Sequence, residues 1–169
     1  MISIRPARED EAAFLAVIGL RAWENATSTI GVTDALRENA SNAFQNFTRS
    51  SWLSINVAEL DGVIAGWSAR EHFDEAISDF WVDPAYQRQG VGAALLEDLE
   101  RQVVNQGFEM IKLESHAQNS QAVAFFQKHG YGVNWLSITY SPKLDRDVQS
   151  VGLQKQLVED SVGTYGPDF

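Results

Sequence analysis

The spacing of hydrophobic residues changes several times along the chain, and each change predicts the start of a new element. In four segments apolar residues recur every three or four positions, as on one face of a helix. In seven others they alternate with polar residues or form a short apolar run, as in a strand. The predicted helices are 14–22, 36–47, 91–103 and 120–129, and the predicted strands are 2–6, 53–58, 63–69, 76–82, 110–114, 131–140 and 151–157.

Capping and turn residues stand at the predicted boundaries. Thr33 is placed to cap the second helix, and Gly107 and Gly130 follow the last turns of the third and fourth helices. Asp61-Gly62 predicts a tight hairpin turn, since glycine tolerates the positive φ that such a turn needs. The order is strand, two helices, three strands, helix, strand, helix and two strands. This order predicts an α/β protein with a mixed sheet.

Length and composition fit one globular domain. The chain has 169 residues, of which 44% are hydrophobic and 21% charged. We expect a single domain over residues 1–160 and a loose C-terminal tail over 161–169, where two glycines and a proline occur. The chain has no cysteine, which excludes disulfides, thiolate metal sites and a cysteine nucleophile. The longest apolar run, 12–20, is too short for a bilayer and follows three acidic residues, so we expect a cytoplasmic protein without a membrane partner.

The charge balance is acidic, with 13 Lys and Arg against 23 Asp and Glu and a net charge of −10. A nucleic-acid-binding protein usually carries a basic face, so we expect no nucleic-acid partner. The three histidines, His72, His116 and His129, lie far apart in the sequence and form no i, i+4 pair. We therefore expect no metal site.

The segment 80–93 predicts an anion site. A hydrophobic strand passes through a turn into Gly90-x-Gly92, which opens a helix whose first amides and dipole favour a negative ligand. Arg88 is the one charged residue between Asp83 and Glu97, which suits a phosphate. The alternative is that both glycines only allow the helix to pack closely on the strand. A Walker loop is excluded because its Lys-Ser/Thr is missing, and a dinucleotide fold is disfavoured because Leu95 replaces its third glycine.

Two spaced motifs carry a family resemblance. The first is Gln87-x-x-Gly90-x-Gly92 after Val82-Asp83-Pro84, and the second is Asn119-x-x-Ala122-x-x-Phe125-Phe126-x-Lys128-x-Gly130-Tyr131. Together they resemble the acyl-CoA loop and the following helix of the GCN5-related N-acetyltransferase (GNAT) family. The resemblance covers about residues 1–158 and implies a mixed, mostly antiparallel twisted sheet. It also implies an acetyl-CoA-dependent N-acetyltransferase, in which a primary amine of a small molecule or peptide attacks the thioester directly.

The resemblance assigns the acetyl-CoA site residue by residue. The pantetheine arm would lie along the strand at 80–82, the pyrophosphate on the amides of 88–93, and an amide near Val82 would stabilise the oxyanion. Asn119 would reach the pantetheine, although Asn is also a common helix N-cap. The implied cofactor-binding residues are Phe80, Trp81, Val82, Gln87, Arg88, Gln89, Gly90, Val91, Gly92, Ala93, Asn119 and Phe126.

Glu114 is the predicted catalytic base. It closes the strand 110–114, five residues before Asn119, where some members of the family carry a catalytic glutamate. The alternative is an exposed carboxylate at a strand end. Other branches place a base at the positions of Ala76 and Ser78; neither residue is a base at neutral pH, although Ser78 could hold a water. Further candidates for the base are Glu71, His72 and His116.

The general acid departs from the family pattern. Phe126 stands where the family carries a tyrosine, and phenylalanine cannot protonate a leaving thiolate. Tyr131, Tyr140 or water could replace it. A catalytically silent acyl-CoA-binding module of the same fold is the alternative function, and a Rossmann-type nucleotide-binding domain, supported only by Gly90-x-Gly92, is a third.

The acceptor is less defined. An acidic cluster of Glu71, Asp74, Glu75 and Asp79 could attract a cationic amine, or form a solvated end of a hairpin. Trp23, near the end of the first predicted helix, lies where the substrate cleft of the family opens. Members of the family often dimerise, so a homodimer is a further expectation.

Overall fold

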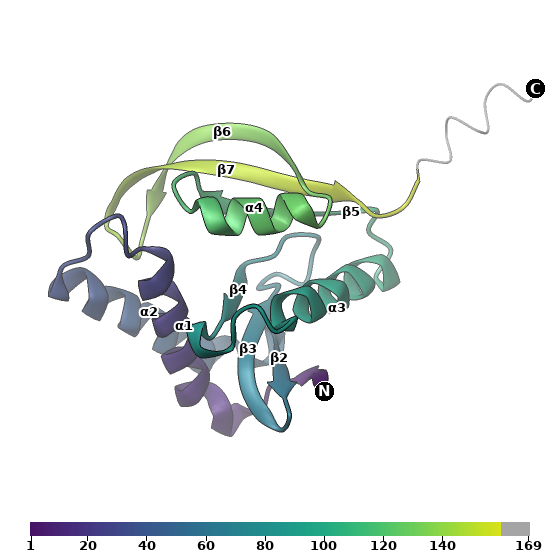
Figure 1. The fold of residues 1–169 in the computed structure, drawn as a ribbon, viewed down its shortest axis with the longest axis horizontal. Coiled ribbons are helices and arrows are strands. Elements are labelled where there is room, and N and C mark those ends of the chain that lie inside the picture. The colour runs from purple at the N-terminus through teal and green to yellow at the C-terminus, as the bar shows by residue number, and fades with distance from the viewer. Residues whose placement is uncertain (160–169) are drawn as a thin grey trace, which may run out of the picture.

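The predicted elements occur in the predicted order in the computed structural model, which describes residues 1–159 (Figure 1). The predicted tail, 161–169, and the domain boundary at residue 160 lie outside the described residues. The helices are α1 (Ala12–Ala26), α2 (Asp34–Ser51), α3 (Val91–Asn105) and α4 (Ser120–Lys128). The strands are β1 (Ile2–Pro6), β2 (Ile55–Leu60), β3 (Val63–Ala69), β4 (Asp79–Val82), β5 (Met110–His116), β6 (Gly132–Ser141) and β7 (Arg146–Gln156).

The strands form two antiparallel sheets rather than one continuous sheet. The first has the order β1-β2-β3-β4 and the second the order β5-β7-β6. A parallel bridge between Ala76 and Lys112 joins them, reinforced by hydrogen bonds from Ile77 N to Lys112 O (2.8 Å) and from Lys112 N to Glu75 O (3.0 Å). The predicted mixed, mostly antiparallel character is confirmed, with the single parallel contact at the junction of the sheets.

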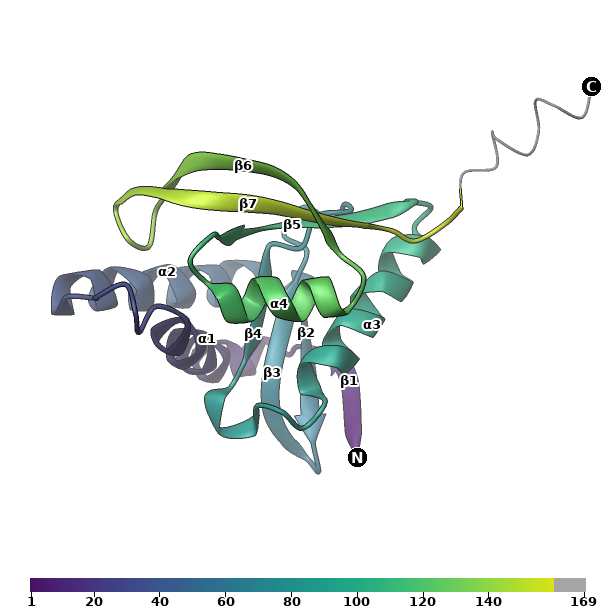
Figure 2. The same ribbon diagram turned by 45° about the horizontal axis from the view of Figure 1, so that its top comes forward.

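The helices cover both faces of these sheets. Helices α1 and α2 pack on one face of the first sheet, and α3 packs on the other (Figure 1). Helix α4 lies under the arch of β5, β6 and β7 and shares a core with α3 and the second sheet (Figure 2). Thr33 caps α2 as predicted, because its hydroxyl accepts a hydrogen bond from Leu36 N at 3.2 Å.

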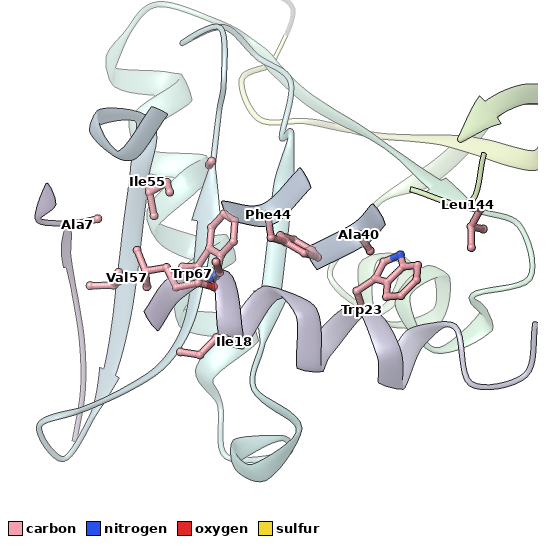
Figure 3. Close-up of a cluster of buried hydrophobic side chains, with 12 residues drawn as sticks. Ala7, Ile18, Trp23, Ala40, Phe44, Ile55, Val57, Trp67 and Leu144 are labelled. Carbon is pink, nitrogen blue, oxygen red and sulfur yellow. Dashed lines mark hydrogen bonds between the residues drawn. The ribbon is translucent and has the colours of Figure 1, made fainter. Parts of the chain in front are cut away.

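The core under α1 and α2 is built around Trp67 of β3 (Figure 3). Trp67 is fully buried and its indole N–H donates to Leu15 O at 2.8 Å. The ring of Phe44 from α2 meets Trp67 and Trp81 edge-on, at centroid distances of 6.3 and 5.1 Å. These contacts fix α1 and α2 against β3 and β4, and so position the C-terminal end of α1 beside the start of β4.

The predicted strand over 76–82 begins too early. Regular pairing with β3 starts at Asp79, and the preceding residues turn toward β5 instead. Ser78 N donates to Ala69 O (2.9 Å) while Asp79 is the register partner of Ala69, so two residues stand opposite one. This bulge bends the strand. The alternation in the sequence could not reveal it, because a bulge changes the pairing and leaves the composition unchanged.

Two further predictions of buried positions are wrong. Leu53, predicted within a strand, lies in a short 3-10 turn and its exposed fraction is 75%. In α1, the predicted apolar face contained Phe14, Val17, Ile18 and Ala22; Ile18 and Ala22 are buried with Leu15, whereas Phe14 and Val17 face solvent. The α1 sequence is apolar on several sides, so its periodicity fits two neighbouring stripes and does not select one.

Candidate active site

Asp83 organises the turn between β4 and α3. Its carboxylate is almost fully buried, accepts a hydrogen bond from Ala85 N (3.1 Å) and pairs with Arg21 of α1 at 2.7 Å. Pro84 follows at the first position of a short 3-10 turn, where its missing N–H costs nothing. The turn thus directs the chain from the end of β4 to the start of α3.

Replacing Arg21 by alanine is expected to destabilise the protein by about 1 kcal/mol. The change leaves the buried Asp83 carboxylate with its backbone partner alone, and the loss is moderated because Arg21 is half exposed. Chemical denaturation measures the effect. Arg37→Ala is the matched control, because Arg37 pairs with Glu24 at 3.1 Å where both side chains are exposed. Equal losses in the two variants would contradict the role given to Asp83.

The start of α3 is the segment predicted to bind an anion, and we refer to residues 87–93 as the anion loop. Arg88 and Gly90 both have positive φ, at 63° and 86°. The first hydrogen bond within the helix runs from Ala94 N to Gly90 O, so the amides of residues 91–93 precede it. The first turn contains no acidic residue, and Arg88 is exposed. A cavity of about 590 Å³ opens onto this loop, bounded on its other side by α4. The geometry suits an anion.

The two glycines also have structural reasons. Gly90 takes the left-handed conformation that glycine adopts most easily. A Cβ on Gly92 would stand 3.2 Å from the ring of Phe125, so Gly92 lets α3 approach α4. The close packing of α3 therefore explains both glycines and is compatible with anion binding by the same loop.

The outer edge of β4 faces a gap between the two sheets. Asp83 N donates to Ala65 O (2.8 Å), and hydrogen-bonded pairs alternate along an antiparallel ladder. The main-chain groups of Phe80 and Val82 therefore point away from β3 and into this gap. Beyond Lys112, β5 pairs with β7 rather than with β4. The gap is the place where an extended ligand can add to the edge of β4.

A second cavity, of about 680 Å³, lies on the other side of this gap. Its walls come from the end of α1, the turn before β4, the end of β5 and the hairpin between β6 and β7. The two cavities share residues of β4 and α4. These shared residues are Ala26, Phe80, Trp81, Asn119, Ala122 and Phe126.

Glu114 lines the second cavity. It alternates along β5 with the buried Leu113, so its carboxylate is on the exposed face of the strand. No hydrogen bond or ion pair ties it to another residue within 1–159. Its position fits the predicted base, which stays a prediction.

The other candidate bases differ in their surroundings. Glu71 and His72 lie at the exposed turn and also line the second cavity. His116 is half-buried at the end of β5, and its Nδ1 has no partner among the described residues. Burial, with the positive charges of Lys143 and Arg146, lowers the pKa of His116, so its imidazole is uncharged at pH 7. The hydroxyl of Ser78 is engaged, donating to Ala69 O and accepting from Glu71 N.

Phe126, at the position of the general acid in the family, and the two candidate replacements, Tyr131 and Tyr140, have different surroundings. Phe126 is buried against Phe80, Phe125 and Tyr131 and borders both cavities. Tyr131 donates its O–H to Glu100 (2.9 Å) and lines neither cavity, so its proposed role as the acid does not fit. Tyr140 lines the second cavity, and its O–H donates to Asp145 of the hairpin.

The predicted acidic cluster is divided by the fold. Glu75 pairs with Lys112 at 3.5 Å, and Asp74 accepts a hydrogen bond from Ala76 N at 2.9 Å. Only Glu71 and Asp79 of the four line the second cavity. The carboxylate of Asp79 accepts a hydrogen bond from the indole of Trp81 (3.0 Å), and burial raises the pKa of Asp79. Asp79, predicted as part of a surface charge cluster, therefore lies in the wall of the second cavity.

Asn119 borders both cavities, whereas Trp23 borders only the second. The side chain of Asn119 accepts a hydrogen bond from Ala122 N at 3.3 Å, which makes it the N-cap of α4. Trp23 is buried at the wall of the second cavity. Lys143, which lines the same cavity from the β6–β7 hairpin, was missed because no local signal in the sequence places that hairpin over β4.

Within residues 1–159, no three His, Asp or Glu side chains converge in a way that could hold a metal ion. No helix in this part of the chain combines the length and the hydropathy needed to cross a bilayer.

The two splayed sheets, with an anion loop at the start of α3, define the fold class of the solved N-acetyltransferases. A GCN5-related N-acetyltransferase from Rhodopseudomonas palustris superposes with a TM-score of 0.77 and 23% identity, covering 92% of this chain and 95% of that chain. The PaiA N-acetyltransferase of Thermoplasma acidophilum, solved in complex with coenzyme A, superposes with a TM-score of 0.76 and 18% identity, covering 92% and 99%.

The chain belongs to the acetyltransferase (GNAT) family, whose model matches residues 18–131. The ribosomal-protein-bS18 alanine N-acetyltransferase of Escherichia coli (strain K12) is 38% identical over 73 residues. This match spans 43% of the present chain and 49%, or about half, of the relative.

Proposed function

We propose that the protein is an acetyl-CoA-dependent N-acetyltransferase that acts on a primary amine of a small molecule or peptide. The observation that carries the proposal is the meeting of two cavities at the free edge of β4. One cavity opens onto the anion loop and the other onto Glu114. Relatives named as N-acetyltransferases, including one bound to coenzyme A, support the same reaction.

The anion loop would hold the phosphates of acetyl-CoA. The amides of residues 91–93 and the side chain of Arg88 supply donors and positive charge to the pyrophosphate. The main chain of Phe80 and Val82 would pair with the pantetheine amides as a neighbouring strand does. This places the thioester at the junction, beside Asn119 and Phe126.

The amine would enter from the second cavity. Its nitrogen attacks the thioester carbonyl carbon, forming the N–C bond, and collapse of the tetrahedral intermediate breaks the C–S bond. The main-chain N–H of Val82, directed into the gap, stabilises the oxyanion. Glu114 takes the proton released by the amine, directly or through water, and the thiolate of CoA receives a proton from water or Tyr140. The cytoplasmic location and the homodimer stay predictions.

Acetyl-CoA is expected to raise the melting temperature of the protein by about 5–10 °C when present at about 100 times its Kd. Binding at that excess stabilises the native state by about 2.7 kcal/mol, and a chain of this length gains about 2–4 °C per kcal/mol. NAD is the control ligand and should give no shift. A shift with NAD and none with acetyl-CoA would replace this proposal by a nucleotide-binding domain.

A catalytically silent acyl-CoA-binding module is the second candidate function. The observation that favours it is Phe126, a buried ring without a proton to donate at the position of the acid. The two candidates differ in turnover. Release of CoA thiol that depends on an added amine supports the transferase, and stabilisation by acetyl-CoA without any such release supports the module.

A further inference from the structure

Two opposite charges lie against a single side chain in the wall of the second cavity. The indole N–H of Trp81 donates to Asp79 at 3.0 Å, and the ammonium of Lys143 lies 6.0 Å from the centre of the Trp81 ring. Lys143 also lies 5.0 Å from the centre of the Phe44 ring. Both charged residues line the cavity.

These two charges do not neutralise each other by direct contact. Among the ion pairs of the described residues, none within 4.0 Å involves Asp79 or Lys143. Glu75 and Lys112, which stand nearby, are paired with each other at 3.5 Å. The cavity wall therefore carries a carboxyl group and an ammonium group that are not paired with each other.

Lys143 is held in place by its neighbours in the hairpin. The side chain of Asn39 on α2 donates to Pro142 O (2.7 Å) and to Lys143 O (3.1 Å). Leu144 is buried in the core with Trp23 and Ala40, whose side chains lie together in Figure 3. The backbone of Lys143 is thus held by the hydrogen bonds from Asn39 and by the buried Leu144. A lysine on a fixed backbone loses less conformational entropy when it binds a ligand.

Asp79 is placed toward the reacting end of the cavity. It immediately precedes Phe80, whose main chain faces the gap where the thioester would lie. Lys143 lies on the β6–β7 hairpin, with its ammonium 6.0 Å from the centre of the Trp81 ring. The wall around them also contains buried polar atoms without a described partner, Trp23 Nε1 and His116 Nδ1.

We propose that Asp79 and Lys143 are the acceptor-recognition residues, and that the acceptor is a free α-amino acid. The amino acid binds with its ammonium group at Asp79, next to the thioester, and with its carboxylate at Lys143; the ammonium loses one proton to water before the neutral amine attacks. This inference rests on the proposed function and adds the class of substrate. A polyamine would place a second positive charge next to Lys143, which is unfavourable. The N-terminal residue of a peptide has no free carboxylate on its α-carbon, so it would leave Lys143 without a partner.

The test compares acceptors that differ in a single group. Release of CoA thiol from acetyl-CoA is measured with the standard α-amino acids, and each active one is compared with its carboxamide and its decarboxylated amine. Spermidine and an alanyl peptide amide complete the set. We expect kcat/KM for the amino acid to exceed that for its carboxamide at least tenfold. Lys143→Met should raise KM for the amino acid about tenfold or more, leave kcat nearly unchanged and remove this preference.

Two further variants complete the design. Asp79→Asn should raise KM for the amino acid and the carboxamide alike, because both present the same ammonium. Arg49→Met removes a cation from α2 outside both cavities, where its guanidinium donates to Asn46, and should change neither constant. Stabilisation by acetyl-CoA in each variant shows that the cofactor site is intact.

Three results would overturn the inference. Carboxamides or polyamines used as well as amino acids would remove the role of Lys143, while leaving the transferase in place. An equal loss for every acceptor in Lys143→Met would make that residue structural. Stabilisation by acetyl-CoA without thiol release from any acceptor would overturn both this inference and the transferase, in favour of the silent module.

Discussion

Replacing Glu114 by glutamine is expected to lower kcat/KM by about 10²-fold or more while leaving the affinity for acetyl-CoA unchanged. The amide has nearly the shape of the carboxylate and cannot accept the proton of the attacking amine, and loss of a positioned base costs a factor of this order. Glu114 lines the second cavity and not the cavity at the anion loop, so the rate should fall while the affinity for acetyl-CoA stays the same. Initial rates of CoA release, with thermal shifts for the cofactor, measure both.

The control for this variant is Glu97→Gln. Glu97 is an exposed residue of α3 that pairs with Arg101 at 3.2 Å, and an exposed pair of this kind contributes little to stability. Its loss should leave kcat/KM unchanged. Wild-type rates in Glu114→Gln would exclude Glu114 as the base and direct attention to the uncharged imidazole of His116, which lines the same cavity.

Reversing the charge of Arg88 is expected to weaken acetyl-CoA binding by about 10- to 100-fold. A hydrogen bond to a charged group contributes about 1.5–3 kcal/mol, and Arg88→Glu adds repulsion of the phosphates. Arg88 has a φ of 63°, and glutamate meets the same backbone strain there, so the change tests charge rather than conformation. Titration calorimetry at two salt concentrations measures the loss, which should shrink as salt increases.

Arg101→Glu is the matched control for this reversal. Arg101 is exposed on the same helix and contacts Glu97 and Asp98 rather than the loop. The same change of net charge there should leave the Kd for acetyl-CoA nearly unchanged. Equal weakening in the two variants would mean that the overall charge of the protein governs binding, and the anion loop would lose its assignment.

The segment that we propose binds acetyl-CoA could be singled out in the sequence because it is local. The end of β4, the Asp83 turn and the start of α3 are consecutive, so motif and geometry coincide within residues 80–93. Asn119 and Phe126 follow the same logic, since the N-cap and one face of α4 lie at the junction. The helices, and most strands, were predicted for a related reason: their patterns depend on near neighbours along the chain.

The walls of the second cavity, where we propose that the acceptor binds, could not be predicted because they are assembled from distant segments. Lys143 lies on a hairpin far along the chain from Trp81, and the packing of Leu144 under α1 and α2, with the hydrogen bonds from Asn39, brings the two together. Tyr131 shows the same limit from the other side. Its sequence position suggested a catalytic hydroxyl, but its side chain turns to Glu100 of α3.

The division of the strands into two sheets has a consequence for cooperativity. A continuous sheet would join β4 and β5 by several main-chain hydrogen bonds, each contributing about 1 kcal/mol, and here that seam closes only beside Ala76 and Lys112. A ligand laid along β4 would restore part of the missing seam. Few main-chain hydrogen bonds therefore join the two sheets along this line, and a ligand bound there is expected to couple the unfolding of the two sheets more tightly.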